Sequence, residues 1–126
     1  MSKFNQQALQ LSQATQRLQE ALTETKTPMI RDSAIQRFEF CLDLTWKTLK
    51  TYLEDNKGII VKSPKECFRV AYQQNLIDYD LKWLELVDLR NETVHTYNED
   101  FADLVYSKLP EALNLFQSLS TILKTL

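Results

Sequence analysis

The stretch that decides the fold runs from Pro28 to Asn56 and reads PMIRDSAIQRFEFCLDLTWKTLKTYLEDN. Its apolar and small residues recur every three or four positions, which places them on one face of an α-helix. The members of this stripe are Ala34, Ile35, Phe38, Cys41, Leu42, Thr45, Leu49 and Tyr52 or Leu53. Gly58 follows at a position where glycine commonly ends a helix. We therefore predict one long amphipathic helix whose stripe packs against the rest of the protein.

Four further segments carry the same periodicity. We predict helices from about Ser2 to Thr25, from Ser63 to about Asn75, from Asp78 or Asp80 to about His95, and from beyond Asn98 onwards. The sequence Ser63-Pro64-Lys65-Glu66 is a strong start signal, with a serine cap, a proline in the first turn and a glutamate that reaches back. The fourth helix carries the apolar residues Leu81, Leu84, Val87, Leu89 and Val94, and we expect His95 to belong to it as well. Pro110 is predicted to kink or divide the last helix.

The composition supports an all-helical protein. One glycine and three prolines in 126 residues are too few for the tight turns of an all-β fold. Long amphipathic helices with short connections pack as antiparallel bundles. We predict an all-α, antiparallel up-and-down bundle of four to five helices, forming a single domain over residues 1–126. The aromatic residues Phe40 and Trp46 lie off the main stripe of their helix and indicate a second partner, such as another subunit.

Several classes of function are disfavoured by the same composition. The net charge of −2 argues against tight non-specific binding of nucleic acid, although a small site can still meet RNA. Cys41 and Cys67 match no metal motif, and a single histidine cannot complete a zinc site, so we predict buried thiols, no metal and no cofactor. The amino-terminal residues have no apolar signal region and no apolar run approaches a membrane span. The expected location is the cytoplasm.

The richest chemistry lies in Arg90-Asn91-Glu92-Thr93-Val94-His95-Thr96-Tyr97, which contains the only histidine. Arginine grips phosphate through a bidentate fork, and histidine transfers protons near neutral pH. His95 would move a proton to or from a ribose 2′-OH or a leaving 5′-oxygen, while Arg90 would neutralise the phosphate. Asn91 would orient the phosphate or the ring. No metal is needed, and the hydroxyl of Tyr97 is placed where a transferase could modify it.

A purely structural interpretation stands beside this one. Positions five apart are separated by roughly 140° around a straight helix, so Arg90 and His95 would not point the same way. Either the helix ends or bends between them, or a loop follows Asn91, or a second copy of the chain brings the two side chains together. In the structural alternative Arg90 pairs with Asp88 or Glu92, His95 caps a helix end and Tyr97 packs.

Weaker candidates lie elsewhere in the chain. Glu39 and Asp43, four residues apart on the second helix, form a candidate carboxylate pair, although most such pairs belong to a solvated face. Lys62, Lys65 and Arg69 gather near the start of the third helix and are a candidate phosphate site, with a solvated basic surface as the more common explanation.

Five segments together resemble the minimal HEPN proteins, in the branch called nucleotidyltransferase substrate-binding proteins, over nearly the whole chain. The most specific segment is Leu89 to Asn98, which fits the family pattern R-x4-H-x-Y. The others are Gln36-Arg37-Phe38-Glu39-Phe40, Leu44-Thr45-Trp46-Lys47, Ser63-Pro64-Lys65-Glu66 and Asn75-Leu76-Ile77-Asp78. The resemblance implies a homodimeric helical bundle with a small MNT-type nucleotidyltransferase as its partner.

Two functions follow from the resemblance. In one, the helical protein is a toxin, a metal-independent RNase with Arg90 and His95 as catalytic residues and Asn91 in support. Its partner transferase, the antitoxin, then inactivates it by adding AMP to Tyr97. In the other, the protein is a non-catalytic subunit that binds a substrate or nucleotide for the transferase. Glu39 and Trp46 match recurrent positions of the branch, and the resemblance assigns them no role.

Overall fold

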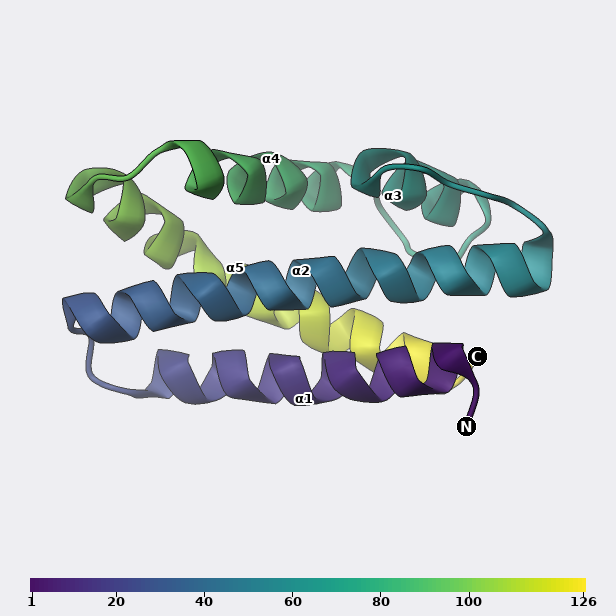
Figure 1. Ribbon diagram of the computed structural model, residues 1–126, viewed down its shortest axis with the longest axis horizontal. Coiled ribbons are helices and arrows are strands. Elements are labelled where there is room, and N and C mark those ends of the chain that lie inside the picture. Colours follow the sequence, from purple (N-terminus) through teal and green to yellow (C-terminus); the bar gives the residue numbers. More distant parts are fainter.

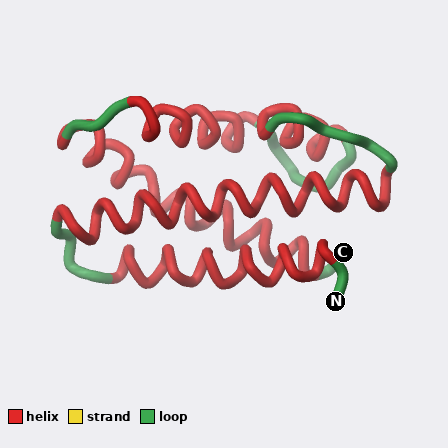
Figure 2. The backbone as a smooth tube through the Cα atoms, in the orientation of Figure 1, coloured by secondary structure: helices red, strands yellow, loops and turns green.

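The computed structural model describes residues 1–126 and consists of five helices with no strand (Figures 1 and 2). The helices are α1 (Lys3–Thr23), α2 (Pro28–Lys57), α3 (Pro64–Gln73), α4 (Leu81–His95) and α5 (Glu99–Lys124). The predicted all-α class is confirmed, and each predicted helix is present within a few residues of its expected bounds. No helix combines the length and the apolar character needed to cross a membrane.

The longest helix, α2, forms the middle of the molecule (Figure 1). α1 runs back along one side of α2, whereas α3 and α4 follow one another along its other side. α5 crosses obliquely and packs against α1, α2 and α4. The start of α1 and the end of α5 consequently lie near one another, and the connection between α4 and α5 lies at the opposite end.

A single cluster of buried apolar residues joins all five helices. At its centre four rings from α2, α3, α4 and α5 touch in sequence. Trp83 stacks on Phe68 with 5.0 Å between ring centroids, and its other neighbour is Phe116 at 5.7 Å. Phe116 in turn meets Phe38 at 6.1 Å. Aromatic contacts of this kind stabilise a core beyond the burial of their area, so these rings fix α4 against α2 and α5.

Four of the five helices begin at a residue whose side chain caps the helix. The side chains of Ser2, Thr27, Ser63 and Asn98 each accept a hydrogen bond from the backbone N–H three residues later. Asp80 precedes α4 as predicted, but its side chain makes no capping hydrogen bond. Glu66 reaches back to the N–H of Lys62, one residue before the expected Ser63. The start of α4 is therefore held by tertiary packing rather than by a side-chain cap.

α5 is a single helix that passes through Pro110 without interruption. Of the two outcomes predicted for Pro110, a kink or a division, the division is therefore wrong. A proline inside a helix costs about 3 kcal/mol, because one hydrogen bond is lost and the ring crowds the preceding turn. Burial on both sides of the proline offsets this cost, since Leu109, Ala112 and Phe116 are completely removed from solvent.

The second face of α2 is only partly free. Trp46 is half-buried and packs against the core of its own chain. Phe40 remains 54% exposed. Of the two aromatic residues from which a second partner was inferred, Phe40 is therefore the more exposed.

Both cysteines are buried free thiols, as the sequence predicts. Burial raises the pKa of each thiol to about 12. The Sγ atom of Cys67 also lies 3.4 Å from the backbone oxygen of Trp46, to which it donates. A thiol with such a raised pKa carries almost no thiolate at neutral pH, so these residues serve packing rather than chemistry.

Candidate functional site

The inward face of α4 contains only some of the apolar residues that the sequence places on this helix. Trp83 and Val87 are buried, whereas Leu81 and Val94 are exposed and do not belong to the apolar face. Arg90 follows Trp83 by seven residues and Val87 by three, so it continues the inward stripe. The helix consequently turns Arg90 towards α2, although it is charged.

Two carboxylates on α2 receive Arg90. Its Nη1 atom lies 4.0 Å from Oε2 of Glu39, and its Nε atom lies 3.8 Å from Oδ1 of Asp43. The Arg90 side chain is 27% exposed. The structural alternative, in which Arg90 pairs with Asp88 or Glu92, is wrong, because its ion pairs are with α2. Asp88 pairs instead with Lys65 at 2.6 Å. The contacts of Arg90 are longer than hydrogen bonds, so its donors are free to bind another anion.

Glu39 is the more enclosed of the two carboxylates, with 28% of its side chain exposed against 39% for Asp43. Burial raises the pKa of Glu39, and the nearby charge of Asp43 raises it further. The Arg90 charge and a hydrogen bond with Thr93 act in the opposite direction and are outweighed. The two residues were weak candidates from sequence, yet the fold brings both to the most promising arginine.

His95 lies on the last turn of α4, which stays helical up to that residue. The N–H of Thr96 still donates to the backbone oxygen of Glu92 at 2.9 Å. The possibility that the helix ends or gives way to a loop after Asn91 is therefore wrong. His95 and Asn91 are both exposed, and Arg90 is half-buried against α2. Within one chain, α4 directs Arg90 and His95 to different sides.

Tyr97 stands in the three-residue connection between α4 and α5. Its side chain is 90% exposed, so the alternative in which this tyrosine packs is wrong. The connection ends at Asn98, whose side-chain oxygen accepts the N–H of Phe101 at 2.8 Å and starts α5. The hydroxyl of Tyr97 is thereby presented to solvent two residues after His95.

A pocket of about 200 Å³ opens between α2 and the α4–α5 connection. Its apolar wall is formed mainly by Ile35, Phe101 and Val105. Its polar lining includes Gln36, Glu39 and Tyr97. The pocket is therefore lined both by the carboxylate beside Arg90 and by the exposed tyrosine. Glu39 lies far from Tyr97 in the sequence, so the motif alone did not indicate that they share a pocket.

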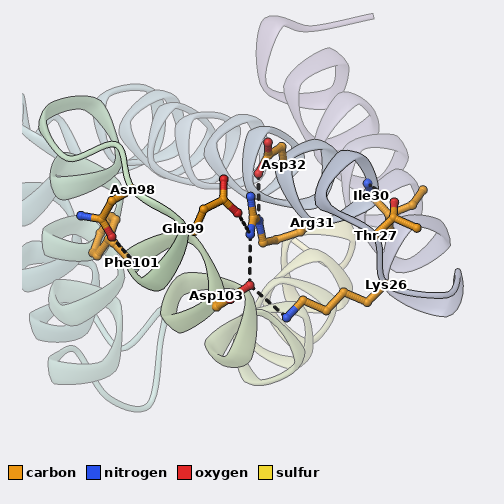
Figure 3. A network of polar contacts seen from close by, with 9 residues as sticks. All are labelled: Lys26, Thr27, Ile30, Arg31, Asp32, Asn98, Glu99, Phe101 and Asp103. Carbon is orange, nitrogen blue, oxygen red and sulfur yellow. Dashed lines mark hydrogen bonds and ion pairs between the residues drawn. The ribbon is translucent and has the colours of Figure 1, made fainter.

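A second ionic cluster, missed by the sequence analysis, fastens the start of α5 to α2 (Figure 3). Arg31 is only 4% exposed, and its guanidinium contacts Glu99 at 2.6 Å, Asp103 at 3.2 Å and Asp32 at 3.0 Å. Lys26 also reaches Asp103 at 3.0 Å. The ion pairs with Lys26 and Arg31 hold the pKa of Asp103 below its usual range.

The signal for this cluster was present in the sequence. Arg31 precedes Ala34 by three residues and therefore belongs to the apolar stripe of α2. A charged residue on a buried stripe requires partners, because an unpaired charge is costly to bury. Its partners on α5 are 68 and 72 residues away in the chain, so the sequence alone did not identify them.

Comparison with known proteins places this arrangement in a family. The family described as "Nucleotidyltransferase substrate binding protein like" matches residues 1–125. A Haemophilus influenzae protein named "Probable ribonuclease HepT" is 34% identical over 84 residues, which cover 64% of this chain. The match spans only 58% of that relative's length.

Solved structures share the fold. A Thermus thermophilus protein is 36% identical, with a TM-score of 0.83 over 90% of this chain and 98% of its own. A tri-AMPylated HEPN toxin of Shewanella oneidensis, solved in complex with an MNT antitoxin, also has a TM-score of 0.83, at 20% identity and with complete coverage of both chains. That second likeness shows a common fold. The resemblance drawn from the sequence motifs is confirmed, and this chain belongs to the family of nucleotidyltransferase substrate-binding-like proteins.

Proposed function

We propose that this chain is the toxin of a toxin–antitoxin pair, a metal-independent RNase that an MNT-type nucleotidyltransferase inactivates by adding AMP to Tyr97. Membership in the nucleotidyltransferase substrate-binding-like family supports the pairing. The ribonuclease name of the Haemophilus influenzae relative and the common fold with an AMPylated toxin support the activity and its control.

The exposure of Tyr97 is the observation that carries the proposal. An acceptor for a bulky nucleotidyl group must be reached by a second protein, and Tyr97 is 90% exposed on a short connection held between two helices. The same residue lines the pocket that reaches Glu39 beside Arg90. AMP attached there adds bulk and a negative phosphate next to the residues that would hold RNA, so modification would exclude the substrate.

The roles of the motif residues follow from their chemistry. Arg90 binds the phosphodiester and neutralises charge that grows on its oxygens, while His95 transfers a proton. Asn91, exposed next to Arg90, orients the phosphate. Because one α4 directs Arg90 and His95 to different sides, a site that uses both is built from Arg90 of one copy and His95 of another. The proposed functional unit is therefore a homodimer.

The intact mass of the protein tests the proposal. We expect that the chain made alone has its unmodified mass, and that co-production with the transferase of its own locus adds one or more adenylyl groups. Tyr97→Phe should abolish the gain, because the phenol oxygen is the acceptor. Tyr106→Phe, at a half-buried tyrosine on α5, is the matched control and should still be modified.

A second candidate, the non-catalytic binding subunit, is favoured by the pocket between α2 and the α4–α5 connection. Apolar walls with a few polar groups are typical of small-molecule sites. In that case the same mass experiment gives an unchanged protein in a stable complex with the transferase, and AMP is found on a separate small molecule. This outcome would replace the toxin proposal.

A further inference from the structure

Glu39 combines two positions that no other residue combines. It contacts Arg90, the proposed phosphate-binding residue, and it lines the pocket that opens towards Tyr97. Asp43 contacts Arg90 but does not line the pocket, and Asp32 lines the pocket but does not contact Arg90. A nucleotide whose phosphate is bound by Arg90 and whose base or ribose enters the pocket would therefore meet the carboxylate of Glu39.

We propose that Glu39 is the general base of the RNase reaction, an inference that rests on the proposed function. Its carboxylate takes the proton from the ribose 2′-OH while the 2′-oxygen forms a bond to phosphorus. The bond from phosphorus to the 5′-oxygen breaks, and that oxygen takes a proton from the His95 imidazolium. The products are a 2′,3′-cyclic phosphate and a 5′-OH, and the two residues then exchange their protons with water.

The reaction requires two proton-transfer groups, one deprotonated group that acts as the base and one protonated group that acts as the acid. Arg90 cannot serve, because a guanidinium does not lose its proton in proteins. His95, the only histidine of the chain, can act as the acid or as the base but not as both in one step. Its place on a different side of α4 from Arg90 also leaves the Arg90 side without an imidazole of its own chain. Glu39 already occupies that side.

The surroundings of Glu39 suit a base. The charged groups next to Glu39 are the carboxylate of Asp43 on α2 and the guanidinium of Arg90 on α4. The carboxylate of Asp32 on α2 and the phenol of Tyr97 in the α4–α5 connection line the same pocket. The pocket residues of α5 carry no titratable group. Burial and Asp43 together raise the pKa of Glu39, and a carboxylate with a raised pKa accepts a proton more readily than an exposed one.

The pocket supplies a place for the nucleoside. Ile35 and Phe101 offer apolar surface, and aromatic rings are common stacking partners for unpaired RNA bases. A base held there keeps its ribose near the mouth, where Glu39 lies between the pocket and Arg90. The bound RNA is therefore single-stranded, since a paired base cannot enter.

Cleavage of a short single-stranded RNA by the full-length, unmodified protein, followed against pH, tests the proposal. Glu39→Gln should lower kcat by about 10²- to 10⁴-fold, the usual contribution of a general base. It should also remove the fall in kcat at low pH, because that fall reports protonation of the base. Asp43→Asn is the matched control, since Asp43 shares the contact with Arg90 and lies outside the pocket. Asp43→Asn should keep the fall in kcat at low pH, and its main effect should be a change in KM.

Three further measurements keep the result decisive. Thermal unfolding of each variant shows whether it is folded, and Glu39→Asp should retain the low-pH fall at a reduced rate if Glu39→Gln does not fold. Equal losses in Glu39→Gln and Asp43→Asn, with unchanged pH profiles, would show that Glu39 only positions Arg90 and would overturn the proposal. A wild-type rate no higher than that of His95→Ala would instead overturn the RNase function itself.

Discussion

The three charged groups Arg90, Glu39 and Asp43 have a formal sum of −1, although Arg90 is the proposed phosphate-binding residue. Ion pairs near 4 Å on partly exposed side chains are each worth about 0–1 kcal/mol. A phosphodiester that offers two short hydrogen bonds to the guanidinium can replace them at small cost. The carboxylates thus hold Arg90 in place between binding events without blocking it.

A different single residue controls the end of α2. Gly58 has φ of +65°, and a Cβ atom there would meet no other atom within 4 Å. The cost of Gly58→Ala is therefore conformational, about 1 kcal/mol, because alanine disfavours the left-handed region. Urea unfolding at neutral pH measures it. Gly58→Asn should lose less, since asparagine tolerates this conformation, and equal stability of alanine and glycine would contradict the explanation.

Most single-residue expectations on α2 hold because its stripe is long and regular. Ala34, Phe38 and Cys41 are completely buried, as predicted. On α4 two of the apolar residues named from the sequence, Leu81 and Val94, are exposed, whereas Trp83, which was not among them, is 2% exposed. That helix has leucines and valines on several sides, so periodicity alone does not fix its face. The stacking of Trp83 on Phe68 of α3 determines which face of α4 points inward.

The helices that flank the candidate site are joined by charge as well as by apolar contact. Arg31 on α2 bonds to Glu99 and Asp103 in the first two turns of α5 (Figure 3). The connection that carries Tyr97 therefore has a fixed helix on each side. Sequence periodicity predicted that α2 and α5 exist. It did not predict this link, which depends on how the two helices cross.

The link makes the start of α5 sensitive to acid. Lys26 makes the largest contribution to lowering the pKa of Asp103, and Arg31 makes the next largest. The ion pairs of Asp103 therefore stabilise the fold fully at pH values above the ordinary aspartate pKa of about 3.9. This stabilisation is lost as the pH falls through the lowered pKa. We expect that Asp103→Asn weakens the acid dependence of the free energy of unfolding, measured by urea titration at several pH values.

Asp100 supplies the control for this expectation. It lies in the first turn of the same helix and is exposed. It is not among the groups that shift the pKa of Asp103. Asp100→Asn should leave the acid dependence close to that of the wild type. The same loss of stability in acid for Asp103→Asn and wild type would show that the ion pairs of Asp103 do not stabilise the fold.

For the molecule as a whole, the divergence of Arg90 and His95 predicts that the RNase site needs two copies. Arg90→Ala and His95→Ala should each be inactive alone. After unfolding and refolding together, mixed dimers contain one complete site, so about a quarter of wild-type activity should return if pairing is random. No recovery in mixtures that light scattering shows to be dimeric would place both residues of a site in one chain.

The homodimer stays a prediction, and the structure shows that the two aromatic residues that indicated it differ in exposure. Trp46 is half-buried against the core of its own chain, and Phe40 is the more exposed of the two aromatic residues. The sequence predicted a second partner because it showed an aromatic face. It could not distinguish a helix of the same chain from a helix of another, since both present the same kind of surface.

The order of the helices also has a consequence for synthesis. α5 leaves the ribosome after α1 to α4. It packs against both α1 and α2 and supplies Phe101 and Val105 to the pocket. A nascent chain that ends before α5 exposes the apolar faces of the earlier helices and lacks one wall of the site. The bundle therefore closes only after α5 has been made, and until then the pocket lacks its α5 residues and Tyr97 lacks the helix that follows it.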